Sequence, residues 1–151
     1  LELGSGDGNQ LKYFKFPTYI GYDISPKAVE ICKQGYRSDG SKSFYLLKDE
    51  PSHDADLSMS LDVIYHLLED DVFEAYLRNL FGAGNRYVII YSSNMVQDGT
   101  AKHVRHRKFT EWIGENIKNF ELIQHVPNKY PYNGDETISS FADFFVYKRK
   151  I

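Results

Sequence analysis

The chain begins with a glycine-rich stretch, LELGSGDGNQ, in which Gly4, Gly6 and Gly8 occupy alternate positions. Glycine lets backbone N–H groups approach a ligand closely, because no Cβ stands in the way. The dinucleotide pattern G-x-G-x-x-G seats a pyrophosphate on a helix N-terminus, but the spacing here is G-x-G-x-G. Glu2 and Asp7 add negative charge around the turn, which favours a cationic ligand over a phosphate.

A further acidic residue, Asp23, ends the next apolar run, TYIGYDIS. A carboxylate about 20 residues beyond a glycine turn is placed to accept hydrogen bonds from both hydroxyls of a ribose. The alternative interpretation is that Asp23 caps the following helix together with Ser25. The turn and the acid together indicate a cationic nucleoside without a pyrophosphate.

Three histidines are candidates for general base catalysis, because imidazole titrates near neutral pH. His66 follows Asp62 by four residues in the run DLSMSLDVIYHL, and His103 and His106 lie in the stretch KHVRHRK. Two alternatives stay open: Asp62 as the cap of a helical turn and His66 as a packed side chain. The pair in HVRH lacks a third nearby ligand, so we expect no metal site.

The stretch KHVRHRK is the concentrated positive patch of the sequence. Arg105 and Arg107 are candidates for binding an acidic acceptor, because guanidinium groups make bidentate contacts with carboxylates and phosphates. The alternative is a solvated lead-in to the next helix. Seven residues on a chain of net charge -3 are a small basic face for nucleic acid, so we expect no nucleic-acid partner. We expect the segment 93–107 to close over the pocket.

The elements that must position these residues alternate between strand-like and helix-like patterns, which is typical of an α/β domain with a mostly parallel sheet. Strands are predicted at 1–3, 19–23, 43–47, 57–61, 87–92, 120–126 and 141–148. Polar turn residues between the last two predict an antiparallel pair at the sheet edge.

Helices are predicted at 9–14, after Ser25 with a stop at Gly35, and over the runs LEDDVFEAYLRNLFGAG and FTEWIGENIKNF. The first of these runs places a set of apolar residues on one stripe: Val72, Phe73, Tyr76, Leu77 and Leu80. The second does so with Trp112, Ile113 and Ile117.

The length of 151 residues predicts a single domain, 1–151. Cys32 is the only cysteine, which excludes an internal disulfide and favours a reducing, cytoplasmic compartment. No window approaches the roughly 20 apolar residues of a membrane span, so no membrane partner is expected.

The motifs LELGSGDG, GYDIS and DLSMSLDVIYHL together resemble those of the class I S-adenosylmethionine-dependent methyltransferases, and the resemblance covers essentially the whole chain. It implies an α/β fold with a Rossmann-like seven-stranded, mostly parallel sheet, an antiparallel edge strand and helices on both faces. It also implies S-adenosyl-L-methionine as the cofactor, held by a set of nine residues: Glu2 at the methionyl ammonium, Gly4, Gly6 and Gly8 under the cofactor, Asp23 at the ribose, Ile24 and Asp49 at the adenine, and Leu61 and Asp62 after the fourth strand.

The implied function is methyl transfer to a small-molecule acceptor, acidic or sugar-like, by in-line displacement. Two other hypotheses stay open: a non-catalytic nucleoside-binding partner subunit, and a nicotinamide-dependent oxidoreductase, which the glycine spacing and Asp7 disfavour. Family members usually carry a complete first strand with a helical segment before it. We therefore expect an incomplete first strand here and part of the acceptor-selecting region before Leu1.

Overall fold

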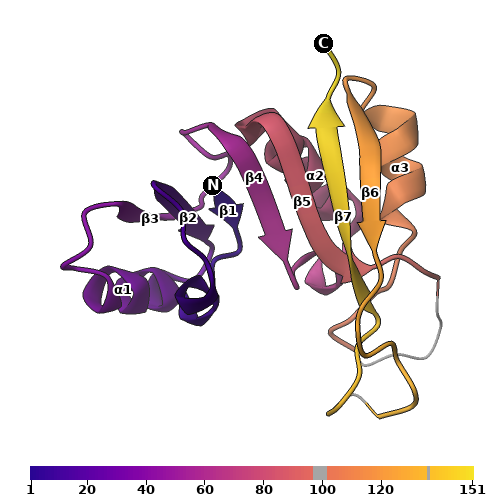
Figure 1. Cartoon of the computed structure of the whole chain (residues 1–151), viewed down its shortest axis with the longest axis horizontal. Coiled ribbons are helices and arrows are strands. Elements are labelled where there is room, and N and C mark those ends of the chain that lie inside the picture. The colour runs from indigo at the N-terminus through magenta and orange to yellow at the C-terminus, as the bar shows by residue number, and fades with distance from the viewer. Residues whose placement is uncertain (97–101, 136) are drawn as a thin grey trace.

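Seven strands form one mixed sheet, flanked by helices (Figure 1). The structure is a computed structural model that describes residues 1–96, 102–135 and 137–151. The strands are β1 (Glu2–Leu3), β2 (Tyr19–Asp23), β3 (Lys42–Leu46), β4 (Ala55–Leu61), β5 (Gly84–Ser93), β6 (Phe120–Val126) and β7 (Ala142–Arg149). The helices are α1 (Pro26–Gly35), α2 (Asp70–Ala83) and α3 (Phe109–Asn116), with short 3-10 helices η1 (Asn9–Tyr13) and η2 (Ile64–His66).

The strand order is β3-β2-β1-β4-β5-β7-β6. β1 pairs in parallel with both β2 and β4, and β4 pairs in parallel with β5. β7 runs antiparallel to β5 and to β6, so it lies one position in from the edge and β6 is the outermost strand. The predicted sheet, with its antiparallel pair at one edge, is confirmed. The chain reverses its direction of progress across the sheet between β1 and β4, which is where open α/β sheets bind ligands.

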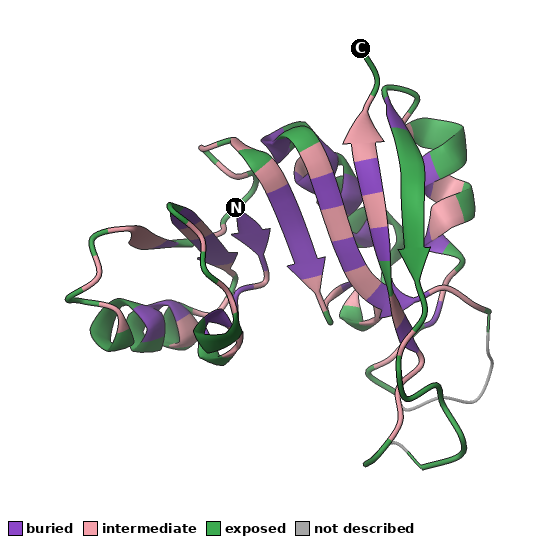
Figure 2. Cartoon of the chain, viewed as in Figure 1, coloured by how far each residue is buried: buried purple, intermediate pink, exposed green. Residues whose placement is uncertain are grey.

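Apolar side chains fill both faces of the sheet in two clusters, and alternation along a strand explains the division. On β5, Val88 and Ile90 belong to the cluster under α2 and α3, whereas Ile89 packs against the cluster under η1 and α1. Val29 and Cys32 are the buried residues of α1. β1 is fully buried, β4 and β5 are buried along their middle and carboxyl halves, and β6 is largely exposed (Figure 2).

Two details of the predicted helices are wrong. Val72 is 45% exposed, because it lies at the border of the stripe in the first turn of α2, whereas Phe73, Leu77 and Leu80 are buried. α3 ends at Asn116 rather than continuing to Phe120, and Ile117 serves as its C-cap. Ser25 caps α1 as predicted, with its hydroxyl accepting from the Ala28 N–H at 3.3 Å. In the described ranges, we find no helix with the length and apolar character needed to cross a membrane.

Candidate active site

The glycine turn leaves β1 at the carboxyl end of the sheet and is held against β2. The backbone N–H groups of Gly4 and Ser5 both donate to the Tyr22 carbonyl, at 2.7 and 2.9 Å. Gly4, Gly6 and Gly8 have φ angles of 82°, 55° and 73°, a region that other residues adopt at a cost. A Cβ at Gly4 would lie 2.4 Å from a methyl carbon of Val63, so the segment after β4 touches the turn.

Glu2 is buried next to the glycine turn and is linked to it through Gln10. Its side chain is fully buried, with one oxygen accepting from the Tyr19 hydroxyl at 2.5 Å and the other from the Gln10 amide at 3.0 Å. The same Gln10 amide lies 2.9 Å from the Ser5 carbonyl oxygen, which ties the turn to this network. Burial raises the pKa of Glu2, and the hydrogen bonds from Tyr19 and Gln10 oppose that shift. The carboxylate therefore braces the turn with both of its oxygens engaged.

Asp23 joins the turn to the start of α1. One carboxylate oxygen accepts from the Gly6 N–H at 2.9 Å, and the other accepts from the Ser25 N–H at 2.8 Å. The carboxylate thus combines the two predicted locations, next to the glycine turn and at the helix start. Ile24 follows it and is 78% exposed, so its side chain is available to pack on a ligand.

The segment after β4 borders the switch point between β1 and β4, opposite the glycine turn. Open α/β sheets bind ligands in a crevice outside the carboxyl ends of the strands at such a point. Leu61 ends β4, and Asp62 follows with a φ of 59°, the only non-glycine residue with a positive φ in the described chain. Strained residues of this kind concentrate at functional sites. The Asp62 N–H donates to the Tyr91 carbonyl at 3.0 Å, and the Tyr65 hydroxyl donates to its carboxylate at 2.7 Å.

The three predicted histidines gather beside this segment. His66 Nδ1 lies 3.2 Å from the His103 carbonyl oxygen. A carbonyl can only accept, so Nδ1 carries the proton and Nε2 of the neutral ring keeps its lone pair. His106 is buried, with Nδ1 2.6 Å from Ser93 Oγ at the end of β5. The Tyr65 ring lies between them, 4.6 Å from the His66 ring and 6.1 Å from the His106 ring.

Arg105 and Arg107 both lie against the start of α2. Both guanidinium groups pair with Asp70, at 3.0 and 3.1 Å, and both donate to the Leu68 carbonyl. Arg107 also donates to the Leu67 carbonyl at 2.5 Å. The hydrogen bonds from Arg107 and then Arg105 hold the pKa of Asp70 below its ordinary value. These contacts fix the 102–107 segment to α2. Residues 97–101 of the segment expected to close over the pocket lie outside the described residues.

The sequence matches the model of a known protein family. The model of the methyltransferase domain family matches residues 1–86, which include the glycine turn, Asp23 and the whole segment after β4. The chain belongs to the methyltransferase domain family. No curated protein matches the sequence.

Solved methyltransferase structures share the fold at low sequence identity. A TehB-like S-adenosylmethionine-dependent methyltransferase from Corynebacterium glutamicum superposes with a TM-score of 0.72 and 18% identity, covering 99% of this chain and 78% of the other. Magnesium protoporphyrin IX methyltransferase from Synechocystis, with bound S-adenosylhomocysteine, gives 0.71 and 16%, covering 99% and 73%. The methyltransferase domain of a bacterial CtHen1 gives 0.69 and 20%, covering 97% and 88%. The predicted cofactor, S-adenosylmethionine, is confirmed by the family match together with the neighbours solved with this cofactor or its product.

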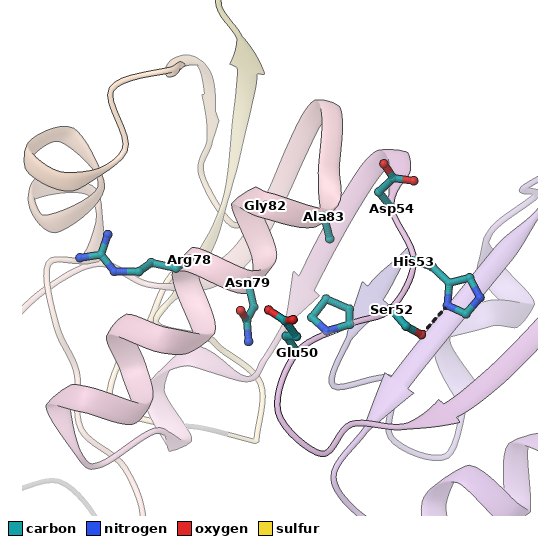
Figure 3. A pocket seen from close by; sticks show the side chains of 9 residues that line it. Glu50, Ser52, His53, Asp54, Arg78, Asn79, Gly82 and Ala83 are labelled. Carbon is teal, nitrogen blue, oxygen red and sulfur yellow. Dashed lines mark hydrogen bonds between the residues drawn. The ribbon is translucent and has the colours of Figure 1, made fainter.

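Cavities lie along α2 of this methyltransferase domain, and one of about 490 Å³ is lined by Asp70 and Phe73 together with Arg105 and Arg107. Another, of about 530 Å³, lies between residues 50–54 and the last turns of α2 (Figure 3). Because α2 leads directly into β5, this cavity lies toward the amino ends of the strands, opposite the glycine turn. A neighbouring cavity of about 590 Å³ is lined by Asp49, whose carbonyl accepts from the Asn79 amide at 3.0 Å. Asp49 thus lies in the β3–β4 connection beside α2.

Sequence reasoning missed four side chains that hold the site together. Tyr19 and Gln10 engage Glu2, Tyr65 engages Asp62, and Ser93 engages His106. The position of Tyr65 between Asp62 and His66 in a single helical turn was a usable signal. No sequence signal indicated the Ser93–His106 contact, because this contact depends on the tertiary fold rather than on local spacing.

Proposed function

We propose that the chain is an S-adenosylmethionine-dependent methyltransferase that transfers a methyl group to a small-molecule acceptor by in-line displacement. The observation that carries the proposal is that the glycine turn and the Asp62–His66 segment meet where the strand order reverses, between β1 and β4. Val63 in contact with Gly4 brings the two segments together. Open α/β sheets bind ligands in a crevice at such a position.

The residues on the cofactor side fit a sulfonium nucleoside. Positive φ angles at the three glycines keep side chains off the turn, and Gly6 faces open space, with no atom within 4 Å of the point where a Cβ would lie. Asp23, at the end of β2, is placed for the ribose, with Ile24 for the adenine. Glu2 braces the turn with both of its oxygens, and we assign it the orientation of the methionyl ammonium through that turn. Asp49, Leu61 and Asp62 complete the proposed cofactor site.

S-adenosylmethionine, when bound, supplies an electrophilic methyl group that moves to a lone pair of the acceptor while the methyl–sulfur electron pair stays on sulfur. The residues of the chain hold the acceptor and receive its proton. We assign the proton to Nε2 of His66, whose Nδ1 is oriented by the His103 carbonyl. His106, set by Ser93, lies on the other side of Tyr65 and helps to position the acceptor.

His66→Gln tests this assignment, because the amide of glutamine can still donate to the His103 carbonyl but cannot accept the proton. Transfer of labelled methyl groups to a library of small hydroxyl and amine metabolites identifies an acceptor first. We expect kcat to fall by about 10² to 10⁴ with S-adenosylhomocysteine affinity unchanged, and the loss to shrink as pH rises.

The matched control is His125→Gln. His125 Nε2 lies 2.7 Å from the Asp143 carboxylate on strands β6 and β7. The His125→Gln variant should therefore leave kcat unchanged. An unchanged kcat in His66→Gln would remove His66 as the base. Binding of S-adenosylhomocysteine without methyl transfer to any acceptor would favour the non-catalytic, nucleoside-binding subunit.

A further inference from the structure

Rings from three separate segments form a continuous row at the carboxyl ends of β4 and β5. We call this set the ring row; it runs through Tyr132, Phe141, His106, Tyr65, His66 and His103. Successive ring centroids lie 3.7, 5.2, 6.1, 4.6 and 6.1 Å apart. The row therefore starts on the long connection between β6 and β7. Its last two rings are those of the proposed base, His66, and of His103.

Hydrogen bonds to the two central strands fix the middle of the ring row. His106 is held by Ser93 at the end of β5, and Tyr65 by Asp62 at the end of β4. The backbone also joins these parts, since the Arg105 N–H donates to the Tyr65 carbonyl at 2.8 Å. The ring planes are thus set by the fold before any acceptor arrives.

The connection that carries Tyr132 and Phe141 extends beyond the carboxyl ends of β4 and β5 (Figure 1) and is anchored to β5. Asn128 donates to the Tyr91 hydroxyl at 2.8 Å, and Ser140 Oγ lies 3.2 Å from the same hydroxyl. The Ser140 N–H closes the connection on itself by donating to the Tyr130 carbonyl at 2.9 Å. This anchoring ties the connection that carries the first two rings to β5.

The row combines exposed ring surface with one carboxylate in direct contact, that of Asp62, which accepts from Tyr65 and disfavours an acidic ligand. Tyr132, His66 and His103 are exposed or partly exposed, whereas Tyr65 and Phe141 are half-buried. The neighbouring guanidinium groups of Arg105 and Arg107 are engaged by Asp70 on α2. Aromatic faces favour offset stacking with planar partners. A surface of this kind suits a flat, uncharged ligand better than a carboxylate.

We propose that the ring row is the acceptor subsite and that it selects a planar, uncharged aromatic acceptor with a hydroxyl or amine group at its edge. The inference rests on the proposed function, because it takes the row to be the acceptor side of the same crevice. It replaces the acidic or sugar-like acceptor expected from the sequence. The acceptor stacks on the row with its hydroxyl or amine directed to His66.

A matched pair of probes tests the inference: naphthol and its fully saturated counterpart, decahydronaphthol. Both carry one hydroxyl on two fused six-membered rings, and only the first is planar and aromatic. Binding is measured by NMR titration of the chain saturated with S-adenosylhomocysteine. We expect naphthol to bind about tenfold more tightly and to shift the resonances of Tyr65 and Tyr132.

Tyr132→Leu and Tyr130→Leu then locate the site. Both tyrosines are exposed on the same connection, at 41% and 60%, but only Tyr132 belongs to the ring row. We expect Tyr132→Leu to weaken naphthol binding about fivefold and Tyr130→Leu to leave it unchanged. Equal affinity for the two probes, or equal effects of the two variants, overturns the inference.

A titration of S-adenosylhomocysteine on the same samples separates the two levels of failure. If it binds and naphthol is not preferred, the aromatic acceptor class is wrong and the proposed function stands. If it does not bind, the proposed function is wrong and the ring row loses its role as an acceptor subsite.

Discussion

The glycine turn on the cofactor side is held mainly by contacts within residues 2–36, whereas the acceptor side is assembled from three distant segments. Glu2 meets Tyr19 across 17 residues and Gln10 across 8. On the acceptor side, the contacts of His66 with His103 and of Asn128 with Tyr91 each join residues 37 positions apart. Most contacts of the turn come from β2 and the α1 region, and Val63 and Tyr76 add contacts from beyond them. The second side depends on the whole fold.

This difference predicts how each side responds to substitution. The cofactor side has little freedom, because its turn uses special backbone conformations and closely packed atoms. The acceptor side is held by a few hydrogen bonds, some to loop carbonyls and some to residues at the ends of β4 and β5, so its segments can loosen while the sheet stays intact. Substitutions on the cofactor side should therefore change cofactor binding and global stability. Substitutions on the acceptor side should change local order.

The largest effect is expected at Gly4. In Gly4→Ala, the new methyl group would overlap Val63 and the residue would keep a φ of 82°, so we expect a loss of about 2–4 kcal/mol in the free energy of unfolding. Gly6→Ala is the matched control, with a φ of 55° and open space around its Cβ position. It should lose about 1–2 kcal/mol from backbone strain alone. Urea unfolding measures both; equal losses would show that contact with Val63 does not matter.

A smaller loss is expected for Arg107→Ala. The Arg107 side chain is 13% exposed and donates to the carbonyls of Leu67 and Leu68, which the variant would leave without this donor. We expect a cost of about 1–3 kcal/mol. Arg105→Ala removes a side chain that is 48% exposed and should cost less. Thermal unfolding decides the order, and an equal or reversed order would contradict the anchoring role of Arg107.

The smallest effect is a pH dependence at Asp70. Its folded-state pKa lies below the ordinary value of 3.8, mainly because Arg107 and Arg105 donate to the carboxylate. Its contribution to stability is therefore present above 3.8 and is lost as pH falls through the lowered folded-state value. Near neutral pH, the urea midpoint of unfolding should be slightly higher for wild type than for Asp70→Asn. In acid, the two midpoints should become equal. A difference that persists in acid would assign the effect to something other than this carboxylate's charge.

The same contrast explains what could be predicted from the sequence. The glycine turn, Asp23 and the Ser25 cap are read from local patterns, and the structure places them together as expected. The strands were found because apolar runs of strand length alternate with helix-like patterns along the chain. The antiparallel pair followed from turn residues between its strands.

The acceptor side could not be predicted because its partners meet through tertiary contacts. Arg105 and Arg107 read as substrate ligands in the sequence, since nothing local shows that Asp70 lies next to them. The ring row joins residues whose spacing follows no helix or strand period. Tyr19 was assigned to its strand, but its bond to Glu2 depends on the register between β1 and β2.

The most direct test of the central claim is calorimetric titration of S-adenosylhomocysteine into three forms of the chain: wild type, Asp23→Ala and Asp56→Ala. Asp56 is an exposed acid on β4 and controls for the change in charge. We predict single-site binding by wild type and Asp56→Ala, and an affinity at least about tenfold lower in Asp23→Ala with its circular dichroism unchanged. No binding to the wild-type chain, or equal affinity in Asp23→Ala, would contradict the account.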